Sequence, residues 1–107
     1  MKKPQHTDFK EIGAYLRALR KFHQETDRCK FTQLRVAERC GLANAQFISN
    51  IERGVDMPTP KVAVILSDLY QIDARIVFEF LKAYKLGRLN DQFEAEQRAL
   101  QNSKDKL

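Results

Sequence analysis

Apolar residues recur every three or four positions along most of the chain, which is the spacing of amphipathic helices. The first such stretch predicts a helix that is capped by Thr7 or Asp8 and ends near Phe22. Its buried face would consist of Phe9, Ile12, Leu16 and Leu19. Residues 23–30 are polar and lack this period, so they predict a loop.

Two short helices are predicted on either side of Gly41. The first opens at Thr32, whose hydroxyl can accept a hydrogen bond from a free amide of the first turn. Gly41 suits the left-handed backbone conformation that ends a helix and starts a sharp turn. The second helix should begin at a cap near Asn44 and end at Gly54. The inward-facing positions of the two helices are Val36, Ala37, Cys40, Phe47, Ile48 and Ile51.

The second half of the chain predicts three more helices. Thr59 followed by Pro60 matches a cap with proline in the first turn, and this helix should run to about Tyr70. Asp73 can cap a fifth helix, which Gly87 interrupts or ends, and residues 90–101 predict a sixth. The expected buried positions of the fourth helix are Ala63, Leu66, Ser67 and Tyr70. The fifth helix carries the apolar residues Ile76, Val77, Phe80, Leu81 and Tyr84.

These elements predict an all-α protein, because no segment has the alternating pattern of a strand. A chain of 107 residues suits one domain. We expect a compact five-helix bundle over residues 9–81, preceded by a basic N-terminal tail at residues 1–8. Residues 82–107 would form a C-terminal helical extension, which is the candidate dimerisation segment.

The net charge of +5 is concentrated in the N-terminal half of the chain. Residues 1–30 carry a net charge of +4 and residues 31–54 one of +1, whereas residues 55–107 carry eight charges of each sign. A local basic excess favours a polyanionic partner, although many soluble domains reach a similar total.

The composition argues against several other classes of protein. Cys29 and Cys40 make no disulfide framework, and without a CxxC pair they predict no metal site. Neither a membrane-length apolar run nor a hydrophobic signal region is present, so we expect a cytoplasmic protein with no membrane association. No catalytic constellation or phosphate-binding glycine loop occurs, and His6 and His23 lie in segments predicted to be mobile. We therefore expect neither an enzyme nor a bound cofactor.

Residues 31–54 carry the most informative pattern. Two short helices joined at a glycine can present the second as a rod with a polar outer face, which fits the major groove of DNA. The order and spacing of the motifs resemble those of the lambda-repressor-like (Cro/CI, or XRE) helix-turn-helix domains over about residues 9–81. The matching motifs are Thr32-Gln33, Ala37-Glu38, Gly41, Ile48-Ser49, Ile51-Glu52-Arg53-Gly54 and Pro58-Thr59, with Leu16-Arg17-Ala18-Leu19-Arg20 upstream.

The resemblance implies a set of DNA-binding residues on and beside the second of these two helices. Gln46 and Asn50 would face the groove, where their amides can make paired hydrogen bonds to adenine. Ser49 and Arg53 would contact phosphates, and Ala45 could at most contact a thymine methyl group. The full set is Gln33, Asn44, Ala45, Gln46, Ser49, Asn50 and Arg53.

Two further roles follow from the resemblance. Gln33 would lie at the start of its helix, near the DNA backbone and the base edges. Arg20 and Glu52 would form a structural ion pair that ties the first helix to the end of the recognition helix.

The chain departs from the family pattern in two places. The interval from Gly41 to Gly54 is one residue longer than usual, with Ala43 as the expected extra residue, so the base-facing positions could shift by one. The loop within residues 22–30 is longer by about six residues than the short connections common in helical bundles. It either follows the DNA backbone or is a solvated excursion, and we slightly favour the second.

The function we infer is a sequence-specific transcriptional regulator, a repressor that binds double-stranded DNA as a homodimer on a palindromic operator. Residues 74–100 would supply the dimer surface, because their aromatic and aliphatic residues exceed what a five-helix core requires. One alternative is an antitoxin that holds a partner protein through this C-terminal segment. Another is a protein-interaction module that kept the fold without binding DNA.

Overall fold

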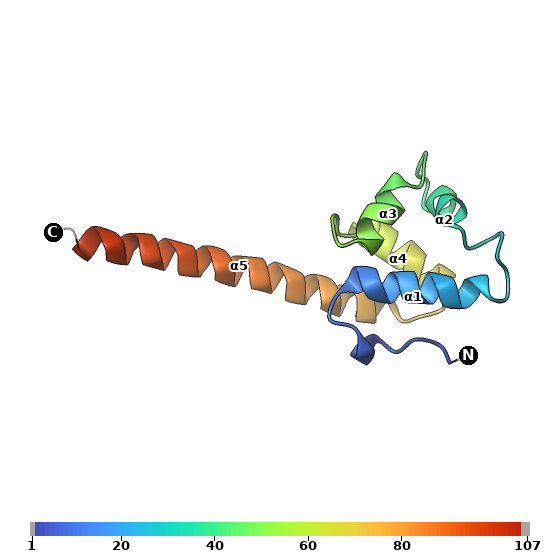
Figure 1. Ribbon diagram of the computed structural model, residues 1–107, viewed down its shortest axis with the longest axis horizontal. Coiled ribbons are helices and arrows are strands. Elements are labelled where there is room, and N and C mark those ends of the chain that lie inside the picture. The colour runs from blue at the N-terminus through green and yellow to red at the C-terminus, as the bar shows by residue number, and fades with distance from the viewer. Residues whose placement is uncertain (1, 106–107) are drawn as a thin grey trace.

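The computed structural model describes residues 2–105 of the protein, with side chains as far as residue 100. Its elements in chain order are the 3-10 turn η1 (His6–Asp8) and the helices α1 (Ile12–Gln24), α2 (Gln33–Arg39), α3 (Gln46–Glu52), α4 (Pro60–Leu69) and α5 (Ala74–Asp105). All regular structure in this range is helical, which confirms the predicted class. In Figure 1, α1 to α4 gather around the start of α5, and the rest of α5 projects from this compact part.

The core lies among α1, α2, α3, α4 and the first turns of α5. Tyr15 and Tyr70 are its largest buried side chains, and only Tyr70 was among the predicted core positions. Tyr84, on α5, is 45% exposed. The core as a whole consists of Ile12, Tyr15, Leu16, Leu19, Val36, Ala37, Cys40, Ile48, Ile51, Val62, Ala63, Leu66, Tyr70 and Val77.

The first helix begins at Ile12, so the prediction that Thr7 or Asp8 caps it is wrong. Residues 6–8 instead form η1, and Phe9 follows with extended backbone angles. The ring of Phe9 still packs against Tyr15, with ring centroids 5.5 Å apart. Phe9 therefore reaches the core as its spacing predicted, but it does so from an extended segment and not from a helix.

The predicted cap residues of the later helices act as expected. The hydroxyl of Thr32 accepts a hydrogen bond from the Arg35 amide at 3.2 Å, and that of Thr59 accepts one from the Val62 amide at 3.3 Å. At the start of α5, the carboxylate of Asp73 accepts from the Arg75 amide at 2.9 Å. These contacts satisfy amides that have no partner within their own helix.

The fifth helix passes through Gly87 without a break, so the prediction that this glycine ends one helix before a sixth is wrong. A single glycine in a helix interior costs only about 1 kcal/mol relative to alanine. Helix-forming residues on both sides are sufficient to continue α5 through this position.

Gly13 lies where α1 crosses α3, and a methyl group there would collide with the backbone carbonyl of Ile51. We predict that Gly13→Ala lowers the free energy of unfolding by about 1–3 kcal/mol, because the colliding atom belongs to the backbone of α3. The matched control is Gly87→Ala, which meets open space and should raise it by about 0.5–1 kcal/mol. Urea denaturation of both variants would measure these effects. A neutral Gly13→Ala would show that α1 and α3 do not approach this closely.

His23 is not in a mobile segment, contrary to the prediction. It lies in the last turn of α1, where its ring stacks between Phe31 and Tyr70 at centroid distances of 4.9 and 5.9 Å. Its Nε2 lies 3.0 Å from the carbonyl oxygen of Tyr70. These contacts attach Phe31, near the end of the 25–32 connection, to the core. The polar sequence that starts at His23 did not indicate this packing.

Burial raises the pKa of the Tyr70 hydroxyl far above its usual value near 10. In the unfolded chain this group loses its proton near pH 10, whereas the folded chain resists the loss. Stability is therefore fully present below about pH 10 and falls above it, by up to about 1.4 kcal/mol per pH unit. We predict that Tyr70→Phe has a flatter decline in urea denaturation between about pH 9 and 11.5. Equal slopes for the two proteins would contradict this, because Tyr15, whose pKa burial also raises, titrates in both.

Candidate nucleic-acid interface

The turn between α2 and α3 is built by a left-handed glycine and a capping asparagine. Gly41 has φ +76°, and the Leu42 amide returns to the carbonyl of Ala37 at 2.9 Å. The side chain of Asn44 then accepts a hydrogen bond from the Gln46 amide at 2.9 Å. Ala45 already has helical backbone angles, and its carbonyl accepts from the Ser49 amide. The residues around Ala43 are thus absorbed in the turn, before the helix starts.

The inner face of α3 is apolar and its outer face is polar. Ile48 and Ile51 are buried, which fixes the rotation of this short helix against the core. Its outer side carries four of the predicted DNA-binding residues, of which Gln46 and Arg53 are exposed and Ser49 and Asn50 half-buried. Asn44 and Ala45 stand at its amino end.

Asn50 is the centre of a hydrogen-bond network on this outer face. Its side-chain carbonyl oxygen accepts from the side-chain amide of Gln46 at 2.9 Å and from the Arg53 guanidinium at 2.6 Å. Its own amide group donates to the carboxylate of Asp56 at 3.1 Å. Asn50 therefore orients Gln46 and Arg53. To contact a base, Asn50 would have to give up some of these hydrogen bonds. Asp56 follows α3 in the chain, and no sequence pattern indicated its part in the network.

Arg20 and Glu52 form a buried ion pair between α1 and α3. The Arg20 Nε and Nη2 atoms lie 2.7 and 2.9 Å from the two carboxylate oxygens, and the Arg20 and Glu52 side chains are only 6% and 3% exposed. Burial is the largest single influence and opposes the charge on Arg20, but the hydrogen bond to Glu52 and the attraction of the Glu52 and Tyr70 charges together outweigh it and raise the pKa of the guanidinium. Gln33 donates to the same carboxylate at 3.0 Å.

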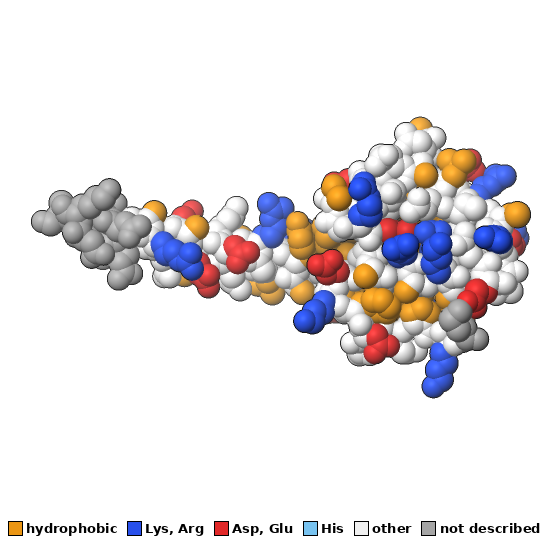
Figure 2. Space-filling model, viewed as in Figure 1, with side chains coloured by type: hydrophobic (Ala, Val, Ile, Leu, Met, Phe, Trp, Pro, Cys, Tyr) orange, Lys and Arg blue, Asp and Glu red, His pale blue; other side chains and the backbone are white. Residues whose placement is uncertain are grey.

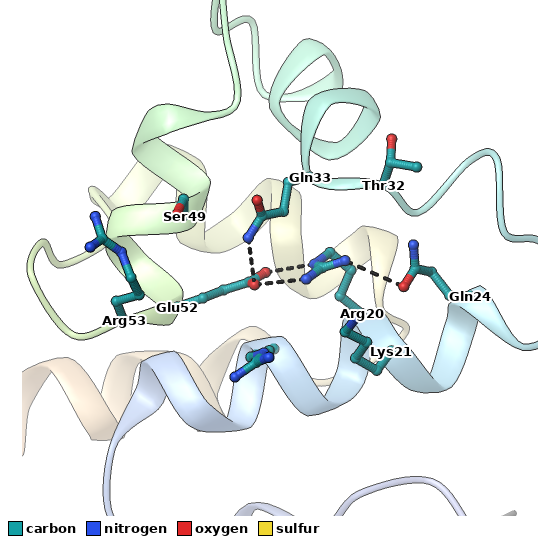
Figure 3. Close-up of a pocket in the computed structure, with 9 residues that line it drawn as sticks. Arg20, Lys21, Gln24, Thr32, Gln33, Ser49, Glu52 and Arg53 are labelled. Atoms are coloured by element: carbon teal, nitrogen blue, oxygen red, sulfur yellow. Dashed lines mark hydrogen bonds and ion pairs between the residues drawn. The ribbon is translucent and has the colours of Figure 1, made fainter.

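Gln33 therefore belongs to this network as well as to the start of α2. Its amide nitrogen is directed toward Glu52, as Figure 3 shows, so a contact to DNA would use the remaining atoms of the amide. The pairing also fixes the beginning of α2 against the end of α3. A glutamine at this position thus joins the two helices of the motif.

An open hollow of about 580 Å³ lies between α1, the start of α2 and α3. Arg53 and Ser49 border it from α3, and Lys21 borders it from α1 (Figure 3). Arg17 of α1 also lines it. Figure 2 shows basic side chains gathered over this face of the compact part, whereas α5 carries a mixture of charges. The remaining lining residues are Arg20, Gln24, Thr32, Gln33 and Glu52.

Arg17 and Lys21 were not among the predicted site residues. They are exposed and four positions apart, so they share one side of α1. Arg20 lies between them in the chain, and its pairing with Glu52 turns this side of α1 toward α3. The helical spacing of the three basic residues could have revealed the cationic edge.

A family model described as Helix-turn-helix matches residues 16–77, which span α1 to the start of α5. The chain belongs to the Cro/CI-type helix-turn-helix family. The match covers more than half of the chain and includes both helices of the motif. Comparisons with curated proteins and with solved structures gave no significant match.

Membership in this family makes the compact part a DNA-binding domain of the type found in transcription regulators. In such domains the second helix of the motif is the recognition helix, which here is α3. Within residues 2–105, no helix combines the length and apolarity needed to span a bilayer. Over the same residues, His, Cys, Asp and Glu side chains form no group of three that could hold a metal ion.

Proposed function

We propose that this helix-turn-helix protein is a sequence-specific repressor that acts as a homodimer on a palindromic operator in the cytoplasm, without catalysis of its own. The observation that carries the proposal is the outer face of α3, where Gln46, Asn50 and Arg53 form one hydrogen-bonded row beside a basic edge. Residues 9–81 would form the DNA-binding domain, and residues 82–107 the extension through which copies meet.

The recognition helix would enter the major groove, which is about 12 Å wide, with its amino end closest to the bases. Gln46 is exposed at this end, so we assign it the principal base contact. Asn50 would read a base after exchanging its bonds within the network. Ala45 would contact at most a thymine methyl group. Asn44, which is exposed at the start of the helix, would lie beside a DNA strand.

Phosphate contacts would come from both sides of the hollow. The same open space is lined by Ser49 and Arg53 on α3 and by Arg17 and Lys21 on α1. One strand of the DNA can therefore lie along it. Gln33 would approach the strand at the amino end of α2. Such contacts hold the domain in register and carry little sequence information.

An antitoxin is the second candidate, favoured by the exposed apolar residues of α5. Leu86, Leu89 and Phe93 are each about 60% exposed and lie beyond the compact part. Isolated apolar residues of this kind need no explanation, but several on one projecting helix favour a protein partner. A toxin could occupy this helix while α3 still binds DNA.

Selection of bound fragments from the source genome, followed by footprinting, tests the proposal. We expect a protected sequence with two inverted half-sites whose centres are about one or two DNA turns apart. We also predict that the affinity for this sequence falls at least about tenfold between about 50 and 200 mM salt, because phosphate contacts release counterions. Absence of binding to genomic fragments at about 50 mM salt would contradict the proposal and favour a protein-interaction module that kept the fold without binding DNA.

A further inference from the structure

The projecting part of α5 carries an apolar stripe that the compact part does not cover. Every described side chain from Lys82 to Leu100 is exposed. Positions 82, 86, 89, 93, 96 and 100 alternate spacings of four and three, which places them on one side of the helix. The four apolar members are Leu86, Leu89, Phe93 and Leu100, which are 59–65% exposed.

This stripe lies on the side of α5 away from the compact part. Val77, which is fully buried in the core, is nine positions from Leu86 and therefore about half a turn around the helix. The compact part thus leaves room for a second helix along the stripe. In proteins most helical stability comes from tertiary packing of an apolar face, so a partner along the apolar side of this projecting helix would stabilise it.

We propose that two copies of this chain pair through α5 in antiparallel orientation, with Leu89 of each copy packed against Phe93 of the other. The proposal deepens the homodimer of the proposed function and rests on it for the identity of the partner. In this register Leu86 lies level with Glu96 of the second copy, and Lys82 lies level with Leu100.

The charges within the stripe select the antiparallel orientation. A parallel pair would place Lys82 against Lys82 and Glu96 against Glu96 of the second copy, which is unfavourable. In the antiparallel pair, Glu96 of one copy lies one residue from the level of Lys85 and about one turn from that of Lys82 of the other. The two interruptions of the apolar stripe thus become mutually attractive.

A groove at the base of α5 fits the end of the second helix. It has a volume of about 440 Å³ and runs beside Pro60, Phe78 and Leu81 to Lys82 and Lys85. Leu100 of the second copy, level with Lys82, would lie at this groove. The paired region would then extend over residues 82–100 in each chain, about 27 Å of helix.

Disulfide cross-linking of the full chain tests the orientation. Lys82→Cys and Leu100→Cys chains, each with Cys29→Ser to remove the exposed native thiol, are mixed in equal amounts and oxidised. We expect a disulfide-linked dimer that contains one chain of each kind, and no linked dimer from either chain alone. Products that join 82 to 82 and 100 to 100 would overturn the antiparallel pair.

Sedimentation of the chain without DNA tests the pairing itself. We expect a dimer that Leu89→Asp weakens at least about tenfold, and that the control Ala95→Asp, on the opposite side of α5, leaves unchanged. Glu96→Lys should weaken it and Glu94→Lys, off the stripe, should not.

A wild-type chain that stays monomeric would overturn the proposal and leave the stripe for a different protein. Fragment binding by Leu89→Asp separates this failure from failure of the proposed function. If the chain is monomeric but still binds duplex DNA, with an affinity that falls as salt rises, only the pairing through α5 is contradicted.

Discussion

Removal of the Glu52 carboxylate is expected to destabilise the domain more than any other single change on its polar residues. Glu52→Leu would leave the Arg20 guanidinium buried without its carboxylate partner, which typically costs about 3–5 kcal/mol. Native domains are stable by only about 5–15 kcal/mol, so the midpoint of thermal unfolding should fall by more than about 10 °C. Calorimetry or thermal circular dichroism would measure this shift.

The partner variants separate an architectural pair from a functional one. Arg20→Met should also lower the melting temperature, because it leaves the buried Glu52 carboxylate without the guanidinium that donates to both of its oxygens. The double variant Arg20→Met/Glu52→Leu should recover much of the loss, since apolar residues can replace a buried pair at little cost. Single variants that melt like the wild type but fail to bind DNA would place the pair in the DNA contact.

Replacement of both outward-facing amides on α3 is expected to remove sequence preference. In Gln46→Ala/Asn50→Ala, the ratio of affinities for the selected operator and an unrelated duplex should fall at least about tenfold, because each paired contact to a base contributes about 1–3 kcal/mol. Binding to the unrelated duplex should change little, since Arg17, Lys21 and Arg53 retain their charges. Fluorescence anisotropy with both duplexes would measure the ratio.

The single variants test how the network divides these tasks. Gln46→Ala and Asn50→Ala should each remove part of the preference and leave binding to the unrelated duplex little changed, although Asn50→Ala also releases Arg53 and Asp56 from the network. Gln92→Ala, which lies far along α5, serves as the matched control and should change neither affinity. Equal loss on both duplexes from Gln46→Ala would assign this residue to phosphate contact or folding.

Much of the fold was predictable because it is specified locally. The caps at Thr32 and Thr59 and the left-handed turn at Gly41 depend on residues within a few positions of each other. The buried faces of α2 and α4 follow from helical period alone. Features that depend on tertiary contact were not predictable in this way.

Three such features show what the local pattern leaves open. The periodicity of Phe9 is compatible with a helix, yet its ring reaches Tyr15 from an extended segment. His23 lies in a polar stretch but stacks against the core. Gly13 is required by the approach of α3, an element about forty residues later in the chain.

The outward residues of α3 were predictable from its helical phase and the family resemblance, but their bonding was not. The row from Gln46 to Arg53 depends on rotamers that meet at Asn50, and it includes Asp56 from the following turn. Arg17 and Lys21 join the site only because the Arg20–Glu52 pair turns α1 toward α3.

An NMR titration of the isotopically labelled chain with the selected operator, at about 50 mM salt, tests whether α3 reads the DNA. We expect the largest amide shifts at residues 44–53 and further shifts at Arg17, Lys21 and Gln33, while the resonances of residues 82–100 stay at the positions they have without DNA. Shifts confined to α5, or none at any residue, would contradict the claim that α3 is the DNA-reading helix of this protein.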